Sequence, residues 1–202
     1  MLSQPKTFFL EILKNLGKLT IAGLLLGLLR EYHWVLAAIL FLRVAHVCYK
    51  KVFKTGENNW ILFTGMILTG IFGLIGEYWG TSNDYWEYND VTVSLPAWLP
   101  FAWMLAFHYL YRLEKKLTPC LKNPSFTNQV LLMIFLTIVI PAYGEMIAIA
   151  AGVWQYYWPY QIFGVPVYAF IALVFVHMLV YAILYYLFKN HNEKDFPFTT
   201  AR

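Results

Sequence analysis

Residues 60–80 read WILFTGMILTGIFGLIGEYWG, a hydrophobic stretch that carries one charged side chain, Glu77, close to its end. A helix needs about 20 such residues to cross the hydrocarbon core of a bilayer. The rest of the chain agrees, because 60% of its 202 residues are hydrophobic and only 13% are charged. Soluble domains carry about 25% charged residues. The sequence therefore predicts an all-α, polytopic membrane protein.

Six hydrophobic runs predict six transmembrane helices in a single integral membrane domain that covers residues 1–202. The first run is the most polar, because Glu11, Lys14 and Lys18 lie in its first half. It either crosses the bilayer fully or begins as an amphipathic surface helix. No small-residue cleavage site follows it, so we expect this run to be retained. The expected spans are about 8–29, 33–50, 59–79, 97–113, 127–149 and 165–188.

Positive charge gathers in every second loop, and this pattern predicts the orientation of the chain. Lysine and arginine favour the cytoplasmic side of a membrane, so we expect both termini to be cytoplasmic. The alternate loops carry Asp84, Glu87 and Asp90, with Arg30 as the exception. The net charge of +4 follows from this topology and does not indicate nucleic-acid binding. The residues that define the cytoplasmic side are Lys6, Lys50, Lys51, Lys54, Arg112, Lys115, Lys116, Lys122, Lys189 and Lys194.

Two glutamates recur in the same local frame. Glu77 and Glu145 each follow a glycine near the end of a hydrophobic run. Each precedes a Trp-x-Tyr triplet by nine positions, at 86–88 and at 154–156, and a proline-containing run follows each triplet. An acidic residue at the edge of the hydrocarbon is costly, so its use twice in one frame favours a functional role.

The two copies also have the same expected direction in the membrane. Spans 59–79 and 127–149 both run outward, and 97–113 and 165–188 both return, which predicts a parallel tandem repeat. Such a repeat would bring the two glutamates to one cavity near the outer surface. Glu31 ends another outward span and is a candidate third acid at a similar depth.

The chemistry expected of these acids is proton transfer. A carboxyl group removed from water favours its protonated form, so Glu77 and Glu145 are candidate catalytic residues that donate a proton to a double bond or accept one. The alternative is structural, with each carboxyl tying a helix end to its neighbour.

The triplets add aromatic side chains to this expected site. An aromatic belt at the membrane interface explains most of the tryptophan and tyrosine on the outer side. Aromatic faces also stabilise cations, which would suit a carbocation formed by protonating a polyene. The candidate substrate-binding residues are Trp86, Tyr88, Trp154 and Tyr156.

Two histidines lie inside the spans that follow the triplets. His108 and His177 are candidate substrate-binding residues that line a polar cavity, or they hydrogen-bond between helices. With the two glutamates they would offer a two-His, two-carboxylate metal site. No His-x-x-x-His or Glu-x-x-His spacing supports such a site, so we expect no metal. No organic cofactor is implied.

The chain lacks the sequence motifs of several other classes of protein. The chain has no phosphate loop, nucleophile elbow, Cys-x-x-Cys pair or histidine box. Their absence argues against a nucleotide-driven pump, a serine hydrolase, a thiol oxidoreductase and a di-iron desaturase. Cys48 and Cys120 have no motif spacing and suggest neither a disulfide framework nor a zinc site.

Both copies carry motif elements found together in one membrane-protein family. The elements are Glu77-Tyr78-Trp79-Gly80 with Trp86-Glu87-Tyr88, and Gly152-Val153-Trp154-Gln155-Tyr156 with Phe163-Gly164-Val165-Pro166 and Phe170. Over about residues 73–180 the chain resembles the carotenoid-biosynthesis membrane protein family, the prokaryotic carotenoid hydratases. Ala169 stands where that family has asparagine. The resemblance implies lyase-type hydration of a carotenoid in a prokaryotic cytoplasmic membrane.

Two functions fit these observations. The first is an integral-membrane enzyme that acts on an isoprenoid, carotenoid or similar lipid by acid–base chemistry, hydrating, isomerising or cyclising a double bond. The second is a small transporter, lipid-binding protein or membrane-complex subunit, with Glu77 and Glu145 as a ligand or proton site. Either function expects contact with the lipid bilayer and with a hydrophobic lipid, and neither involves nucleic acid.

Overall fold

The structure is a computed structural model that describes residues 2–54, 59–89 and 91–188, and these residues are mainly helical. In these residues a helix lies at each of the six predicted positions, with ends that differ from the expected spans by a few residues. The helices are α1 (Pro5–Leu28), α2 (His33–Cys48), α3 (Trp60–Ser82), α4 (Leu99–Leu117), α5 (Phe126–Ala150) and α6 (Val167–Phe188).

Short elements connect the helices. A π-helical turn continues α2, a 3-10 turn follows α4, and four short strands lie in the α3–α4 and α5–α6 connections. Strand β1 pairs antiparallel with β2, and β3 pairs antiparallel with β4. These elements are η1 (Tyr49–Lys54), η2 (Thr118–Cys120), β1 (Trp86–Tyr88), β2 (Trp154–Tyr156), β3 (Gln161–Ile162) and β4 (Val165–Pro166).

Local sequence signals mark the ends of α3 and α5. The Asn59 side chain accepts a hydrogen bond from the backbone N–H of Leu62 at 2.8 Å. The Ser125 side chain accepts one from the backbone N–H of Asn128 at 3.4 Å. Both side chains therefore satisfy amides that a helix start leaves without intrahelical partners. After α5 the chain turns at Gly152, whose φ of +70° suits a residue without a Cβ atom.

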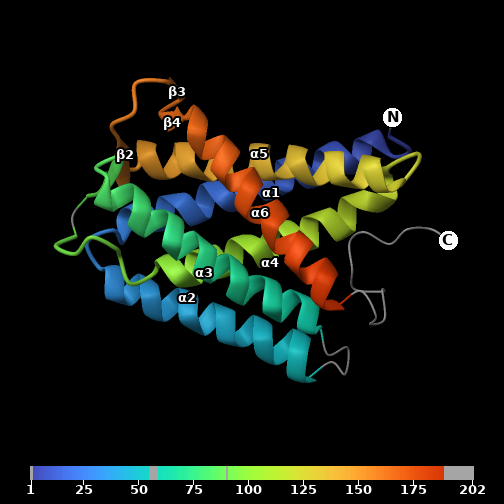
Figure 1. The fold of residues 1–202 in the computed structure, drawn as a ribbon, viewed down its shortest axis with the longest axis horizontal. Coiled ribbons are helices and arrows are strands. Elements are labelled where there is room, and N and C mark those ends of the chain that lie inside the picture. The colour runs from blue at the N-terminus through green and yellow to red at the C-terminus, as the bar shows by residue number, and fades with distance from the viewer. Residues whose placement is uncertain (1, 55–58, 90, 189–202) are drawn as a thin grey trace.

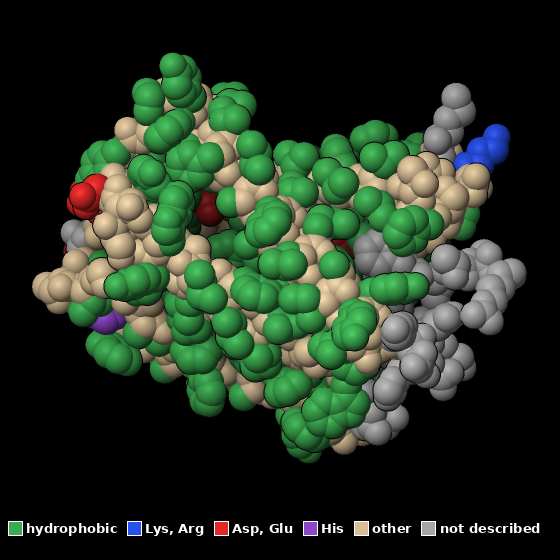
Figure 2. All heavy atoms as spheres, viewed as in Figure 1, with side chains coloured by type: hydrophobic (Ala, Val, Ile, Leu, Met, Phe, Trp, Pro, Cys, Tyr) green, Lys and Arg blue, Asp and Glu red, His purple; other side chains and the backbone are tan. Residues whose placement is uncertain are grey.

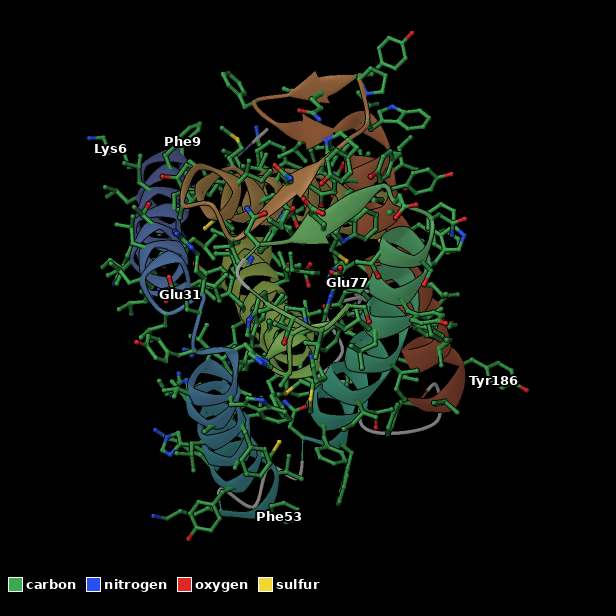
Figure 3. All side chains as sticks on the ribbon, turned by 90° about the vertical axis from the view of Figure 1, so that its left-hand side faces the viewer. Lys6, Phe9, Glu31, Phe53, Glu77 and Tyr186 are labelled. Carbon is green, nitrogen blue, oxygen red and sulfur yellow. The ribbon has the colours of Figure 1, made fainter. Side chains whose placement is uncertain are left out.

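The six helices run alternately between the two ends of an elongated bundle (Figure 1). The start of α1 and the end of α6 lie at one end, and the four strands lie at the other. Helix α4 is central and packs against α2, α3 and α5, while α6 packs against α3 and α5, and α1 packs against α5. The end-on view shows the same grouping, with α2 on the opposite side of the bundle from β3 and β4 (Figure 3).

Among the described residues, three helices are long and apolar enough to cross a membrane, by length and composition: α3, α5 and α6. Helix α2 has 16 residues, fewer than the roughly 20 needed to span the hydrocarbon core. Helix α1 carries Glu11, Lys14 and Lys18, and charges also fill the last turns of α4. On the face in Figure 2, hydrophobic side chains dominate, and charged side chains lie mainly at the two ends of the long axis. The apolar helices indicate a membrane protein in contact with a lipid bilayer.

Helices α3 and α4 approach closely because glycines of α3 face large rings of α4. A Cβ atom added to Gly65 would lie 2.1 Å from the Phe107 ring, and one added to Gly73 would lie 2.3 Å from the Trp103 ring. Small residues at membrane helix interfaces allow this close contact. The packing brings the Trp103 indole next to the last turns of α3, where Glu77 lies.

The lysines expected on the cytoplasmic side lie at the end of the bundle that holds the start of α1. Lys50, Lys51 and Lys54 are in η1, which continues α2, and Lys115 and Lys116 are in the last turn of α4. Three residues used in the orientation argument, Asp90, Lys189 and Lys194, lie outside the described residues. The cytoplasmic location of both termini stays a prediction.

Candidate functional site

Glu77 lies in the last turns of α3 and accepts three side-chain hydrogen bonds. Its Oε2 atom accepts one from the indole Nε1 of Trp86 at 3.0 Å and one from the hydroxyl of Tyr88 at 2.7 Å. Its Oε1 atom accepts one from the indole Nε1 of Trp103 on α4 at 3.1 Å. Both oxygens of Glu77 are therefore engaged by neighbouring rings.

Glu145 lies in the last turns of α5 and repeats two of these contacts. Its Oε2 atom accepts a hydrogen bond from the indole Nε1 of Trp154 at 3.2 Å and one from the hydroxyl of Tyr156 at 2.9 Å. The donors follow the glutamate by 9 and 11 positions in both copies. The spacing that the sequence singled out is thus a spacing between a carboxyl group and its two donors.

The strand pair joins the two carboxyl groups. In the antiparallel register Trp86 faces Tyr156, and Tyr88 faces Trp154. The facing rings lie 5.5 Å and 5.7 Å apart between centroids. Each triplet ring that binds one glutamate therefore contacts a triplet ring that binds the other. Glu77 and Glu145 also lie within electrostatic range of each other.

The alternation of a β-strand explains why the triplets read Trp-x-Tyr. Successive side chains of a strand point to opposite faces, so the first and third residues face the carboxyls and the middle residue faces outward. The middle residues Glu87 and Gln155 are exposed, and Gln155 donates a hydrogen bond to Glu87. Burial raises the pKa of the Tyr88 and Tyr156 hydroxyls well above the ordinary value, so both remain protonated donors.

Glycines of α3 make room for the indoles that bind Glu77. A Cβ atom added to Gly80 would lie 1.7 Å from the Trp86 ring, and one added to Gly73 would lie 2.3 Å from the Trp103 ring. The glycines that precede the glutamates have a different environment. No atom lies within 4 Å of a Cβ added to Gly76 or Gly144.

A second pair of rings packs against the strand pair. Trp98 contacts Tyr88 and Trp154, with centroid distances of 5.9 Å and 6.4 Å. Tyr168 contacts Trp86 and Tyr156, with centroid distances of 6.3 Å for both. Trp98 and Tyr168 therefore occupy corresponding positions, each against one tryptophan and one tyrosine of the two triplets.

The two copies differ in how many carboxyl oxygens are engaged. Trp103 of α4 binds Glu77, whereas among the described residues no donor binds the Oε1 atom of Glu145. Both glutamates are half-buried. Glu145 therefore has an oxygen available for an exchangeable proton or a ligand, and Glu77 is the more firmly held carboxyl group beside it.

The acidic residues at the strand end of the bundle differ in depth. Glu31, Asp84 and Glu87 are exposed, whereas Glu77 and Glu145 are half-buried. Figure 3 shows Glu77 directed into the interior beneath β1, and Glu31 at the end of α1 on another side of the bundle. In Figure 2, acidic atoms are visible in a recess between hydrophobic side chains near this end. Glu31 thus lies at the expected end but is not part of the carboxyl pair.

The two histidines lie elsewhere. His177 is buried and its Nε2 atom lies 2.7 Å from Oε1 of Glu114, whose Oε2 accepts a hydrogen bond from the Tyr181 hydroxyl. His108 is buried within electrostatic range of Arg43 and Arg112. The structure does not bring either histidine to the glutamate pair, and in the described residues no group of three or more His, Cys, Asp or Glu could hold a metal.

Sequence reasoning missed Glu114 because it placed this residue in the loop after span 97–113. In the structure α4 continues to Leu117, and Glu114 is fully buried. A signal was present in the spacing of α4. Phe107, Leu110, Glu114 and Leu117 are buried and follow one another at intervals of three or four residues, so they lie on one face of the helix. A charged residue on the apolar face of a helix requires a partner in the core.

Sequence reasoning also missed Tyr168. The sequence does contain a signal for Tyr168, because an aromatic residue stands two positions after a proline in both copies. These residues are Trp98 after Pro96 and Tyr168 after Pro166. This shared spacing from a proline identifies Trp98 and Tyr168 as equivalent positions of the two copies. Only the structure, however, places Tyr168 next to Trp86 of the other copy.

Comparisons of the chain with protein-family models, with curated proteins and with solved structures find no match. The class of protein therefore rests on the fold and the site alone. It is a helical membrane protein in which two half-buried carboxyl groups lie under a pair of aromatic strands at one end of the bundle.

Proposed function

We propose that all six helices cross the membrane, and that α3–α4 and α5–α6 are a parallel tandem repeat with both termini in the cytoplasm. The repeat is supported by hydrogen bonds at identical offsets from Glu77 and Glu145. It is supported further by the matching positions of Trp98 and Tyr168. The orientation is supported by the lysines that gather at the end opposite the strands.

The site acts, on this proposal, as the active site of an integral-membrane enzyme for an isoprenoid, carotenoid or similar lipid. One observation carries the assignment: Glu145 has an oxygen that no donor in the described chain engages, next to a glutamate whose two oxygens are both engaged. Paired acids in different environments are the usual arrangement for acid–base chemistry. On this proposal the enzyme belongs to the carotenoid hydratase-like family.

The chemistry assigned to Glu145 is proton transfer to a double bond. Its carboxylic acid donates the proton, the π electrons of the alkene form the new C–H bond, and the other alkene carbon becomes a cation. The carboxylate of Glu77 and the faces of the surrounding rings stabilise this cation. Loss of a proton to Glu145 from a carbon next to the cation isomerises the lipid. Attack of a second double bond of the lipid on the cation, before that proton loss, forms a C–C bond and cyclises it. Addition of water to the cation, with loss of one of the water protons to Glu145, hydrates it.

Access from the lipid phase supports a lipid substrate over a water-soluble one. The outer surface of the helices is rich in exposed hydrophobic side chains, such as Ile75 at 61% and Ile171 at 67% exposure. Acidic atoms are visible between such side chains from the side of the bundle (Figure 2). A hydrophobic chain in the bilayer could therefore reach a carboxyl without passing through water.

A non-enzymatic function is the second candidate, and the hydrogen bonds themselves favour it. Five donors hold the two carboxyls, and four of these come from the strand pair. In a transporter, lipid-binding protein or complex subunit, the carboxyls would anchor the strands to α3 and α5 and bind a proton or ligand. This function predicts that glutamine, which keeps most of the hydrogen bonding, is tolerated at both positions.

The test replaces each glutamate with glutamine in a carotenoid-producing host. Expression of the wild-type chain should change the isoprenoid profile, Glu145→Gln should abolish the change, and Glu77→Gln should reduce it. Glu87→Gln is the matched control, because Glu87 lies on β1 between the donors Trp86 and Tyr88 but is exposed. A wild-type chain that leaves the profile unchanged, or a Glu145→Gln variant with full activity, would refute the enzymatic assignment.

A further inference from the structure

Tyr168 has a buried polar atom that the proposed chemistry does not use. The residue lies in the first turn of α6, and its hydroxyl oxygen is buried with no hydrogen-bond partner in the described chain. Buried polar groups are nearly always hydrogen-bonded, so a buried hydroxyl without a partner calls for a specific explanation. A ligand that supplies the hydrogen bond is one such explanation.

The surroundings of Tyr168 place this hydroxyl at the glutamate pair. Its ring contacts Trp86, which binds Glu77, and Tyr156, which binds Glu145. The hydroxyl therefore belongs to the same site as the carboxyls, and it comes from the α5–α6 half of the chain, as Glu145 does.

The position that corresponds to Tyr168 in the other copy has no such group. Trp98 packs against Tyr88 and Trp154 and is buried, and its side chain has no hydroxyl. The same copy has Trp103 to engage the second oxygen of Glu77. Both groups that lack partners, the Tyr168 hydroxyl and the Oε1 atom of Glu145, therefore belong to one half of the site.

These two groups define the chemistry of a ligand. The phenol of Tyr168 can donate a hydrogen bond, and a carboxyl oxygen of Glu145 can accept one. A single alcohol hydroxyl can pair with both groups, because its lone pairs accept from the Tyr168 phenol and its proton is donated to Glu145. The rings of Trp86, Tyr156 and Trp158 around Tyr168 provide an apolar wall for the chain attached to that hydroxyl.

We propose that Tyr168 and Glu145 bind the hydroxyl group of a lipid alcohol, with the hydrocarbon chain of the alcohol lying against the aromatic rings. This inference rests on the proposed function in taking the ligand to be a lipid. It names the substrate or product class of the same site as an alcohol. Tyr168 is then a specificity-determining residue that distinguishes an alcohol from the parent hydrocarbon.

The experiment compares three probes of one carbon skeleton with the purified full chain in detergent: farnesol, its methyl ether and farnesene. Quenching of tryptophan fluorescence measures binding. The alcohol both donates and accepts, the ether only accepts, and the hydrocarbon does neither. We expect farnesol to bind about tenfold more tightly than farnesene, which corresponds to about 1.4 kcal/mol, with the ether between them.

Tyr168→Phe removes the hydroxyl and keeps the ring. We expect it to weaken farnesol binding about tenfold and to leave farnesene binding unchanged, and the retained farnesene binding also shows that the variant is folded. Tyr78→Phe is the matched control, because Tyr78 lies at the same end of the bundle and is 64% exposed. Equal affinities for all three probes, or unchanged farnesol binding by Tyr168→Phe, would overturn the inference.

Failure of the inference and failure of the proposed function give different results. If the wild-type chain changes the isoprenoid profile but Tyr168→Phe neither lowers that activity nor weakens farnesol binding, the inference is wrong and the enzyme assignment stands. If farnesol binding depends on the Tyr168 hydroxyl but no isoprenoid profile changes, the alcohol site stands and the enzyme assignment is wrong.

Discussion

The two ends of the bundle each hold carboxyl groups beneath the hydrophobic surface, but these groups have different partners. At the strand end, Glu145 is half-buried and has one oxygen that accepts no hydrogen bond from the described residues. At the opposite end, Glu114 is fully buried, and both of its oxygens are bonded to side chains of α6.

This difference separates two uses of an acidic residue in a membrane protein. Glu114 connects two helices through His177 and Tyr181, so its carboxyl contributes to the association of α4 with α6. Glu145 is bonded to a strand pair and retains an open oxygen. A carboxyl with every oxygen satisfied by fixed groups is suited to structure, and one with an open oxygen is suited to chemistry.

The largest expected effect concerns Glu114. Glu114→Ala removes the carboxyl to which buried His177 and Tyr181 are hydrogen-bonded, so the free energy of unfolding should fall by about 3–5 kcal/mol. Denaturant titration in detergent micelles, followed by circular dichroism, measures this change. Glu11→Ala is the matched control, because Glu11 pairs with the 55%-exposed Lys116 at 2.7 Å, and an exposed ion pair should change the free energy of unfolding far less. An equal loss in Glu145→Ala would remove the distinction between the two ends.

The next largest effect concerns the fit of the indole over Glu77. Gly80→Ala places a Cβ atom 1.7 Å from the Trp86 ring, so the ring must move, and we expect a loss of about 1–3 kcal/mol in the free energy of unfolding. Gly76→Ala is the control in the same helix. Its added Cβ atom would meet no side chain within 4 Å, so it makes no contact like that between Gly80 and the Trp86 ring. That variant should be neutral or more stable by about 0.5–1 kcal/mol. Equal results for the two variants would contradict the packing described for Trp86.

A smaller effect tests the difference between Glu77 and Glu145. Trp103→Phe removes the donor to Oε1 of Glu77, which is 3.1 Å from the indole nitrogen, and should cost about 0.5–1.5 kcal/mol. Glu77 would then have an open oxygen as Glu145 does. We expect the enzymatic activity to decrease, because the fixed negative charge beside Glu145 becomes less well positioned. Unchanged stability and activity would show that Trp103 does not distinguish the two acids.

The smallest effect concerns the outer surface of the strand pair. Hydrogen bonds from Tyr157 and Gln155 lower the pKa of the exposed Glu87 carboxyl. A lowered pKa in the folded state contributes stability above the unfolded pKa, and this contribution is lost as the pH falls through the folded value. Glu87→Gln should therefore slightly lower the melting temperature near pH 7 and flatten the acid side of the profile, so that the two proteins converge toward pH 3. Thermal melts of both proteins from pH 7 to pH 3 measure this difference.

Much of the fold was predictable because its signals are local. Each of the six helices corresponds to a hydrophobic run, and helical hydrogen bonds form within such a run without reference to the rest of the chain. The largest error was at the end of α4, which continues from the expected residue 113 to Leu117. There the charges of the last turn suggested a loop, whereas Glu114 is part of the buried face.

The sequence by itself determined the helical class of this protein and the frame around Glu77 and Glu145. The two donors lie 9 and 11 residues after the glutamate. Glutamate and donors therefore belong to one helix end and the strand after it, and their spacing can be read directly from the sequence. Only the tertiary structure decided that Trp103, 26 positions from Glu77, supplies a third donor. It also decided that Glu114 meets His177, 63 positions away, and that Tyr168 contacts rings of both copies. Such contacts depend on which helices pack together and at what distance, and the summed packing of all the side chains sets that arrangement.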